Sequence, residues 1–444
     1  MKARTLAAAA FVAVALVASA GSGQSKGILP LTLRPAPPAN PPLGITFGRL
    51  DTRLTRLDPR TLLPRGRGVS LERFSSAWSF APDRRQLVFG SAYSPLSESP
   101  AALRFFDVAT LRPLRDLVLG PSAYIQVLDW VAPERLLVVM RSCCPAAWSV
   151  SLLDPADGTV LARHPLEGEL AAARRARGGL VLLREPASLG PVSLAVAGAD
   201  GTVRSVVLDQ IQAGVSMSPA PLSYLGEDRA GLAVDPVGGH AYALAASGPI
   251  ADVDLASLGV TYHSLARPVS LLGRLRDWLE PSAQAKGPTE RSTRSGVWLG
   301  DGRLAVFGRN TTAYSSNGRL DVRIRPSGLT VIDTRSWTSQ MLDPRSAWAV
   351  VARDALLSFG STWDSGKQQE IGSGLRVYGR DGAMRLQLFG KRVIGPVEVF
   401  GARAFVHRSS PGSDYQIVNL TTGRVLRTIH RDLPVVLRGA GSGY

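Results

Sequence analysis

The chain repeats one pattern along most of its length: four short apolar runs, each bounded by Gly, Pro, Asp or Ser. In one copy, over residues 75–120, the expected strands are Ala77–Phe80, Gln86–Gly90, Leu103–Val108 and Leu114–Leu119. We name these runs strands a to d in chain order. Helical periodicity is nearly absent, and short apolar runs between turn residues are typical of β-strands.

The turn between strands c and d sets the period of the repeat. Asp107 and Asp154 occupy this turn in successive copies, 47 residues apart, and Asp-Gly pairs recur at Asp200 and Asp381. Four-stranded units with a period of about 40–50 residues are typical of a β-propeller, in which neighbouring blades cover each other's apolar faces. The alternative, an array of β-sandwiches, needs linkers between domains of about 100 residues, and we find none. We expect an all-β propeller of four-stranded antiparallel blades.

The number of blades depends on how the two chain ends are interpreted. Seven complete units can be traced from about residue 73 to 431. Residues 44–69 resemble strands b, c and d of a further unit, with Asp58 in the turn, and residues 433–439 resemble a lone strand a. Pairing these ends would close the ring and remove its free edge. The sequence therefore predicts eight blades, or seven blades with an extra outer hairpin.

The N-terminus resembles an export signal. A basic start and an apolar stretch too short to span a bilayer precede an Ala-x-Ala motif at 18–20. We expect a signal peptide over 1–20, with an uncleaved membrane anchor as the alternative, and a proline-rich flexible tether over 21–43. A single propeller domain over 44–439 and a tail over 440–444 follow. The predicted location is secreted or extracytoplasmic, in the cell envelope.

One segment, residues 270–296, interrupts the repeat. Leu271, Leu275 and Trp278 fall at helical spacing, and Pro281 follows. This pattern predicts a short amphipathic helical insertion and then a polar linker. The helix could pack against the propeller or dock to a partner or a membrane surface.

The net charge of +16 is spread along the chain. No arginine-rich block resembles a nucleic-acid-binding arm, so we expect no nucleic-acid partner, although weak attraction to anionic surfaces is compatible with this charge. The expected partner is a protein or a cell-envelope polymer, and the expected state is a monomer.

The sequence contains no common catalytic or phosphate-binding motif, such as G-x-S-x-G or H-E-x-x-H. The five histidines are scattered, so we predict no metal site and no catalytic residue; a site assembled from several blades around the axis stays open. The histidines are His164, His240, His263, His407 and His430.

In a propeller the b–c and d–a connections share one face, where ligands usually bind. The b–c connections are the long ones here, at 91–100, 142–147, 310–328, 361–374 and 409–414. Their aromatic and polar side chains suit sugars or peptides, and the alternative is that they are merely solvated loops. The candidate ligand-binding residues are Tyr93, Cys143, Cys144, Tyr314, Trp363, Asp364 and Lys367, with Glu370 beside them.

Several repeats resemble those of known propeller groups. "FAPDRRQLVF" (80–89) resembles the core of TolB/WD40-like and YVTN-like repeats, and "LLDPADGTVLA" (152–162) and "VNLTTGRVL" (418–426) look like quinoprotein-type repeats. The last resemblance implies an exported eight-bladed enzyme with pyrroloquinoline quinone (PQQ) and calcium. This chain departs from it, because Ala162 and Arg427 stand where that family has tryptophan. We therefore predict no cofactor.

Cys143 and Cys144 are the only cysteines and are adjacent. Several quinoprotein-type enzymes carry a disulfide between adjacent cysteines, which this pair resembles, and thiols oxidise in an exported protein. Neighbouring Cα atoms lie about 3.8 Å apart, below the usual disulfide span of about 4.4–6.8 Å, so such a bridge would be strained. We predict a vicinal disulfide that stiffens the loop, with two free thiols as the alternative.

The function predicted from these features is a non-catalytic binding or scaffolding module whose ligand lies on the face with the long b–c connections. The alternative is a quinoprotein- or lactonase-type propeller enzyme with a site on the axis.

Overall fold

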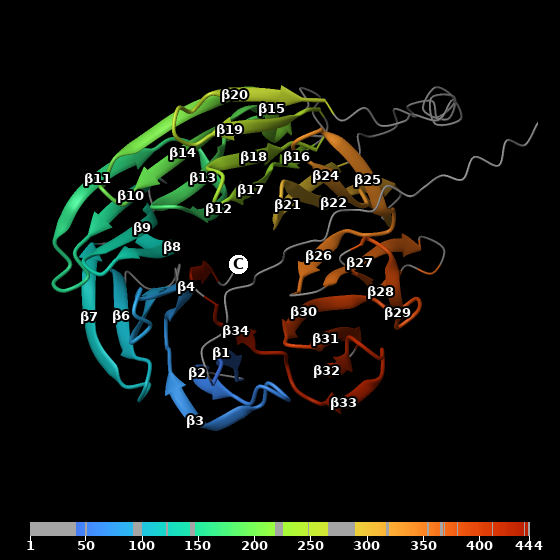
Figure 1. Ribbon diagram of the computed structural model, residues 1–444, viewed down its shortest axis with the longest axis horizontal. Helices are drawn as coiled ribbons and strands as arrows, with labels where there is room; N and C mark the ends of the chain where they lie inside the picture. Colours follow the sequence, from blue (N-terminus) through green and yellow to red (C-terminus); the bar gives the residue numbers. More distant parts are fainter. Residues whose placement is uncertain are drawn as a thin grey trace, which may run out of the picture.

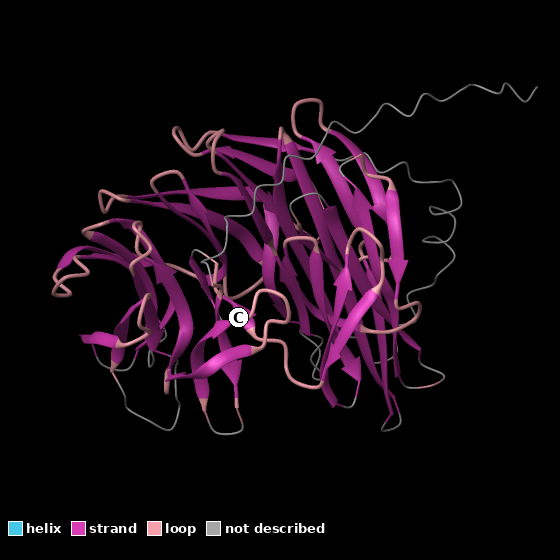
Figure 2. Ribbon diagram, turned by 60° about the horizontal axis from the view of Figure 1, so that its bottom comes forward, coloured by secondary structure: helices cyan, strands magenta, loops and turns pink. Residues whose placement is uncertain are grey.

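The computed structural model shows β-sheets arranged in a ring around a central axis (Figure 1). It describes residues 41–48, 51–91, 100–120, 123–142, 147–217, 225–246, 248–264, 289–316, 319–352, 355–364, 367, 369–379, 381–410, 412–438 and 440–442. Every regular element in these ranges is a β-strand (Figure 2). None of these ranges contains a helix long and apolar enough to cross a membrane. The predicted fold, a β-propeller with four-stranded antiparallel blades, is confirmed.

Six of the seven sheets form one blade each. From the axis outward, the blade at the chain ends contains β34 (Val435–Val436), β1 (Leu43–Phe47), β2 (Thr52–Leu57) and β3 (Pro64–Ser70). The next contains β4 (Phe74–Phe80), β5 (Gln86–Ser91), β6 (Ala101–Asp107) and β7 (Pro113–Gly120), with β35 (Ala440–Ser442) beside β4. The third contains β8 (Ala123–Ala132), β9 (Arg135–Ser142), β10 (Ala147–Leu153) and β11 (Val160–Leu166).

The other three single blades follow later in the chain. One contains β17 (Gly231–Asp235), β18 (His240–Leu244), β19 (Ile250–Asp254) and β20 (Val260–His263). Another contains β26 (Trp348–Val351), β27 (Ala355–Asp364), β28 (Gln369–Gly379) and β29 (Met384–Leu388). The last contains β30 (Ile394–Phe400), β31 (Arg403–Ser410), β32 (Gly412–Asn419) and β33 (Val425–Ile429).

The seventh sheet has ten strands and contains two four-stranded runs. The first run is β12 (Glu169–Ala176), β13 (Gly179–Glu185), β14 (Gly190–Gly198) and β15 (Val203–Met217). The second is β21 (Thr289–Gly300), β22 (Arg303–Ser316), β24 (Leu329–Asp333) and β25 (Thr338–Asp343), with β23 (Arg319–Pro326) paired to β22. β16 (Leu225–Arg229) joins the two runs, because it pairs antiparallel with the end of β15 and parallel with the start of β21.

Three predictions need correction. The expected number of seven or eight blades is wrong: six sheets form one blade each, and the two remaining four-stranded runs are fused through β16, which pairs with the end of the long strand β15. In the insertion at 270–296, the end of the expected polar linker is wrong, since 289–296 belong to β21; the expected helix lies within 270–288, outside the described ranges. The expected tail at 440–444 includes β35, which pairs with β4. Residues 1–40 also lie outside the described ranges.

The turns between strands c and d have one physical basis. In each, the side-chain oxygen of an Asp or Asn accepts a hydrogen bond from a backbone N–H two or three residues later, which closes the tight turn. Arg65 and such backbone bonds lower the pKa of Asp58 to about 2. The turn residues are Asp58, Asp107, Asp154, Asp200, Asp254, Asp333, Asp381 and Asn419.

The hydrophobic core is divided among the interfaces between neighbouring blades. The last interface closes the ring: Leu57 from β2 packs with Phe405 and Tyr415 of the blade β30–β33. Each fully buried side chain of this size contributes about 1.5–3 kcal/mol. Tyr415 Oη also donates a hydrogen bond to Thr61 O at 2.6 Å. Because β34 pairs with β1, the predicted joining of the two chain ends in one blade is confirmed.

Candidate functional site

Three b–c connections extend as paired strands on one face of the ring. β22 and β23 stay paired from Arg309 with Pro326 out to Ser316 with Arg319. The hairpins β27–β28 and β31–β32 belong to the next two blades, and β23 packs beside β27. The predicted loops at 310–328 and 361–374 are therefore largely strand. We call this surface the hairpin face, defined by residues 309–316, 319–326, 361–364, 367, 369–372, 408–410 and 412–414.

The tip of β27–β28 brings several predicted site residues together. Trp363 stands opposite Glu370 in the strand register, and Asp364 Oδ1 accepts a hydrogen bond from the backbone N–H of Lys367 at 3.2 Å. Trp363 is half-buried, and its Nε1 is buried without a hydrogen-bond acceptor among the described residues. Ser361 Oγ donates to the Glu370 carboxylate. The Lys367 side chain is exposed.

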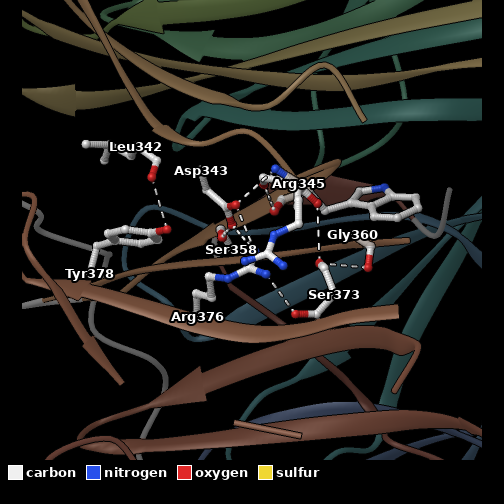
Figure 3. A network of polar contacts seen from close by, with 10 residues as sticks. Leu342, Asp343, Arg345, Ser358, Gly360, Ser373, Arg376 and Tyr378 are labelled. Atoms are coloured by element: carbon white, nitrogen blue, oxygen red, sulfur yellow. Dashed lines mark hydrogen bonds and ion pairs between the residues drawn. The ribbon is translucent and has the colours of Figure 1, made fainter. Parts of the chain in front are cut away.

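A buried polar network holds the base of this hairpin (Figure 3). Arg376 of β28 forms an ion pair with Asp343 at the end of β25, at 2.7 Å. Ser358 Oγ of β27 also donates to the Asp343 carboxylate. Arg376 Nη2 donates to Ser373 O at 3.0 Å, and Ser373 Oγ donates to Gly360 O at 3.0 Å. These contacts join two neighbouring sheets and set the direction in which β27 and β28 project.

The other predicted site residues are less well defined. Tyr93, Cys143 and Cys144 lie outside the described ranges, and Tyr314 lies in β22, where only its backbone is described. Their roles and the vicinal disulfide stay predictions.

A cavity of about 500 Å³ lies beside the described ends of β9 and β10. Ser142 at the end of β9 and Ala147 at the start of β10 line it together with Trp148. Trp148 Nε1 donates to Glu169 Oε2 at 3.1 Å, and Arg141 Nη2 is 2.8 Å from Glu169 Oε1. This wall of the cavity is therefore held by a charged network.

Sequence reasoning missed the arginines that surround a cavity on the ring axis. This cavity has a volume of about 540 Å³ and lies against the inner strands β8, β12, β17 and β21. A second cavity of about 830 Å³ adjoins it, because Arg174 and Arg175 line both. The only signal in the sequence is that Arg174 and Arg175 are adjacent. The arginines that line the first cavity are Arg174, Arg175, Arg229 and Arg294.

Arg175 connects β12 to the neighbouring strand β8. Its Nη2 donates to Trp130 O at 3.1 Å, and its Nε lies 3.4 Å from Asp129 Oδ1. Asp129 is fully buried, and neither of its carboxylate oxygens accepts a hydrogen bond from the described part of the chain. Burial raises the pKa of Asp129 to about 6, and the positive charge of Arg175 only partly opposes this shift.

Arg229 and Arg294 are each held by several acceptors. Arg229 Nε donates to Glu227 at 2.7 Å, and its Nη1 lies 3.9 Å from Glu185. Burial raises the pKa of Glu185, which also accepts a hydrogen bond from Ala230 N at 2.6 Å. Arg294 is 8% exposed and donates to Asn310 Oδ1 at 2.9 Å and to Ala246 O at 2.7 Å.

Within the described ranges, no group of three or more His, Cys, Asp or Glu side chains could hold a metal ion. The histidines make separate contacts instead. His240 Nδ1 lies 2.8 Å from Asp252 Oδ1, and His164 Nε2 lies 2.8 Å from Gly201 O. The ring of His263 stacks on Trp337 at 3.5 Å, and burial lowers the pKa of His263.

No protein-family model and no curated protein matches the chain. Among solved structures, it is similar to dihydro-heme d1 dehydrogenase NirN at 15% identity and TM-score 0.49, covering 94% of this chain and 78% of that one. It is also similar to BamB from Moraxella catarrhalis (12% identity, TM-score 0.44, 86% and 94% covered). A third is the β-propeller domain of Cps50 (Swd1) from Myceliophteria thermophila (14%, 0.36, 80% and 97%). At these identities the similarity concerns the fold alone.

Proposed function

We propose that this chain is an exported, non-catalytic binding or scaffolding module that holds a partner protein or a cell-envelope polymer on the hairpin face. The observation that carries this proposal is the extension of b–c hairpins in three neighbouring blades. The parts of these strands that project beyond the blades do not contribute to the hydrophobic core of the ring. Such projecting segments are where scaffold folds usually bind partners.

The charge of the hairpin face supports an acidic partner. Arg323 and Arg325 on β23 and Lys367 at the tip of β27–β28 are exposed. Arg309 lies 4.9 Å over the ring of Trp348, so the base of the β22–β23 hairpin is fixed to the next blade. A fixed basic surface attracts acidic proteins and anionic polymers across distances up to about the Debye length of the solution.

The test compares two double charge reversals. Arg325→Glu with Lys367→Glu alters the hairpin face, while Arg112→Glu with Arg424→Glu makes the same change in net charge on exposed c–d turns. Retention on an immobilised anionic cell-wall polysaccharide, and cross-linking to co-exported proteins, are measured at physiological salt. We expect the first variant to lose retention at least about tenfold and the second to keep it.

The outcomes separate this proposal from its alternative. Equal retention of both variants, or no retention of the unaltered chain on either bait, contradicts the hairpin face as the binding site. Turnover of lactones, or a higher melting temperature with calcium or PQQ, would instead support the enzyme with an axial site. The proposal includes no cofactor.

A further inference from the structure

The axial cavity of about 540 Å³ has an unbalanced charge. Among the described residues, its lining includes four arginines and no carboxylate. The arginines come from three strands that are distant in sequence: Arg174 and Arg175 from β12, Arg229 from the end of β16, and Arg294 from β21. The fusion of two four-stranded runs through β16 brings Arg229 to the cavity. The tertiary structure therefore gathers four positive charges around one space.

Three of the four guanidinium groups are held in place by protein acceptors. Arg175 and Arg229 contact carboxylates that lie behind the cavity wall, at Asp129 and Glu227. Arg294 donates to the side chain of Asn310 and to backbone carbonyls. These arginines are fixed in position before any ligand arrives, which reduces the entropy cost of binding.

Arg174 differs from these three. Its Nη1 donates to Ala173 O at 2.8 Å, and it forms no ion pair with any carboxylate of the described ranges. The Arg174 side chain is exposed and lines the cavity, and desolvation by the surrounding strands lowers the pKa of its guanidinium. Apart from the bond to Ala173 O, the N–H donors of Arg174 meet no acceptor among the described residues, so they are available to a ligand.

We propose that the axial cavity binds a small oxyanion, carboxylate or phosphate, with Arg174 as its direct contact and Arg175, Arg229 and Arg294 supplying the surrounding positive field. A guanidinium forms paired, charge-assisted hydrogen bonds with both anion types. Low-dielectric walls strengthen the attraction. The cavity volume lies within the range of about 300–1,000 Å³ that small-molecule sites occupy. The lining of this cavity shares no residue with the hairpin face, and in the described part of the chain the two sites meet only where Arg294 donates to Asn310 at the base of β22–β23.

The experiment titrates the mature chain with pyrophosphate and with citrate by calorimetry at low ionic strength. These probes distinguish a phosphate ligand from a carboxylate ligand. We expect saturable binding of at least one probe, weakened about 10- to 100-fold by Arg174→Gln. Arg174→Lys keeps the positive charge but loses the planar guanidinium, so its affinity for the probe should lie between those of the unaltered chain and Arg174→Gln.

Arg177→Gln is the matched control. Arg177 is exposed three residues further along, beyond the end of β12, and lines neither axial cavity. Arg177→Gln should bind both probes as the unaltered chain does. Equal weakening by Arg174→Gln and Arg177→Gln would show a general charge effect and overturn the proposal, as would the absence of saturation by both probes below about 10 mM. The double variant Arg325→Glu with Lys367→Glu should bind the probes as the unaltered chain does. The probe titration therefore tests the axial cavity separately from the binding proposed for the hairpin face.

Discussion

Arg376 Nη1 donates hydrogen bonds to both carboxylate oxygens of Asp343, at 2.8 and 2.7 Å, although each side chain is only 2% exposed. Ser358 and the backbone N–H of Arg345 also donate to this carboxylate. The buried charge is therefore paired and surrounded by donors (Figure 3). The pair links β25 to β28, and so supports the hairpin that the proposed function uses.

Removing one member of this pair should destabilise the fold strongly. We expect Arg376→Ala to lower the free energy of unfolding by about 3–5 kcal/mol, because Asp343 would be left as an unpaired buried charge. Urea denaturation measures the change. The control is Arg385→Ala, which breaks an exposed pair with Asp381 and should cost no more than about 1 kcal/mol. Similar losses in both variants would contradict the structural role of the buried pair.

The hydrogen bond that closes the ring can be tested through Tyr415. Tyr415→Phe keeps the aromatic packing against Phe405 but removes the bond to Thr61 O. We expect a loss of about 0.5–1.5 kcal/mol in unfolding free energy and faster hydrogen exchange in β2 and β33. Tyr378→Phe, which loses a bond to Leu342 O within the ring, should leave exchange in β2 and β33 unchanged. Unchanged stability and exchange in Tyr415→Phe would show that this bond does not hold the closure.

The buried carboxyl of Asp129 should make stability depend on pH. Its pKa is raised from 3.8 to about 6, so the folded state holds this proton more tightly than the unfolded state does. The stability it contributes is present below about pH 4 and is lost as the pH rises through about 6. We therefore expect the change in unfolding free energy caused by Asp129→Asn to be more favourable at about pH 8 than at about pH 4, by about 1–3 kcal/mol.

The measurement is urea denaturation of both proteins at these two pH values. Asp116→Asn, at a half-exposed carboxylate, is the control. The same effect of Asp129→Asn at both pH values would refute the raised pKa.

The redox state of Cys143 and Cys144 is decided by intact mass. If the predicted vicinal disulfide forms, iodoacetamide should add no alkyl group to the unreduced protein and two after reduction. Reduction should change the unfolding free energy little, because the bridge closes almost no loop of the unfolded chain. Two alkyl groups on the unreduced protein would establish free thiols instead.

Local residue patterns predicted the strands well and their continuation poorly. The expected strand Gln86–Gly90 differs from β5 by one residue at one end, and Leu114–Leu119 differs from β7 by one residue at each end. By contrast, 310–328 and 361–374 were expected to be loops, because their polar residues and glycines resemble turn sequences. Most of their described residues form strands instead, because each arm pairs with the other arm of its own hairpin. A polar hairpin lacks the alternating apolar residues that would predict it.

The candidate site was predicted only in part for a similar reason. Trp363, Asp364 and Lys367 are close in sequence, so their proximity at one hairpin tip was predictable. Arg174, Arg229 and Arg294 come from separate strands, and nothing in their local sequence indicates that they surround one cavity.

The sequence by itself determined the repeat, the blade hairpins and the joining of the chain ends, because alternating apolar residues and Asp-containing turns act over a few residues. The tertiary structure alone decided which blades fuse and which charges meet. β15 continues past its blade to pair with β16, and this non-local pairing places Arg229 beside the β12 arginines. Such contacts depend on the closure of the whole ring, and no local pattern specifies them.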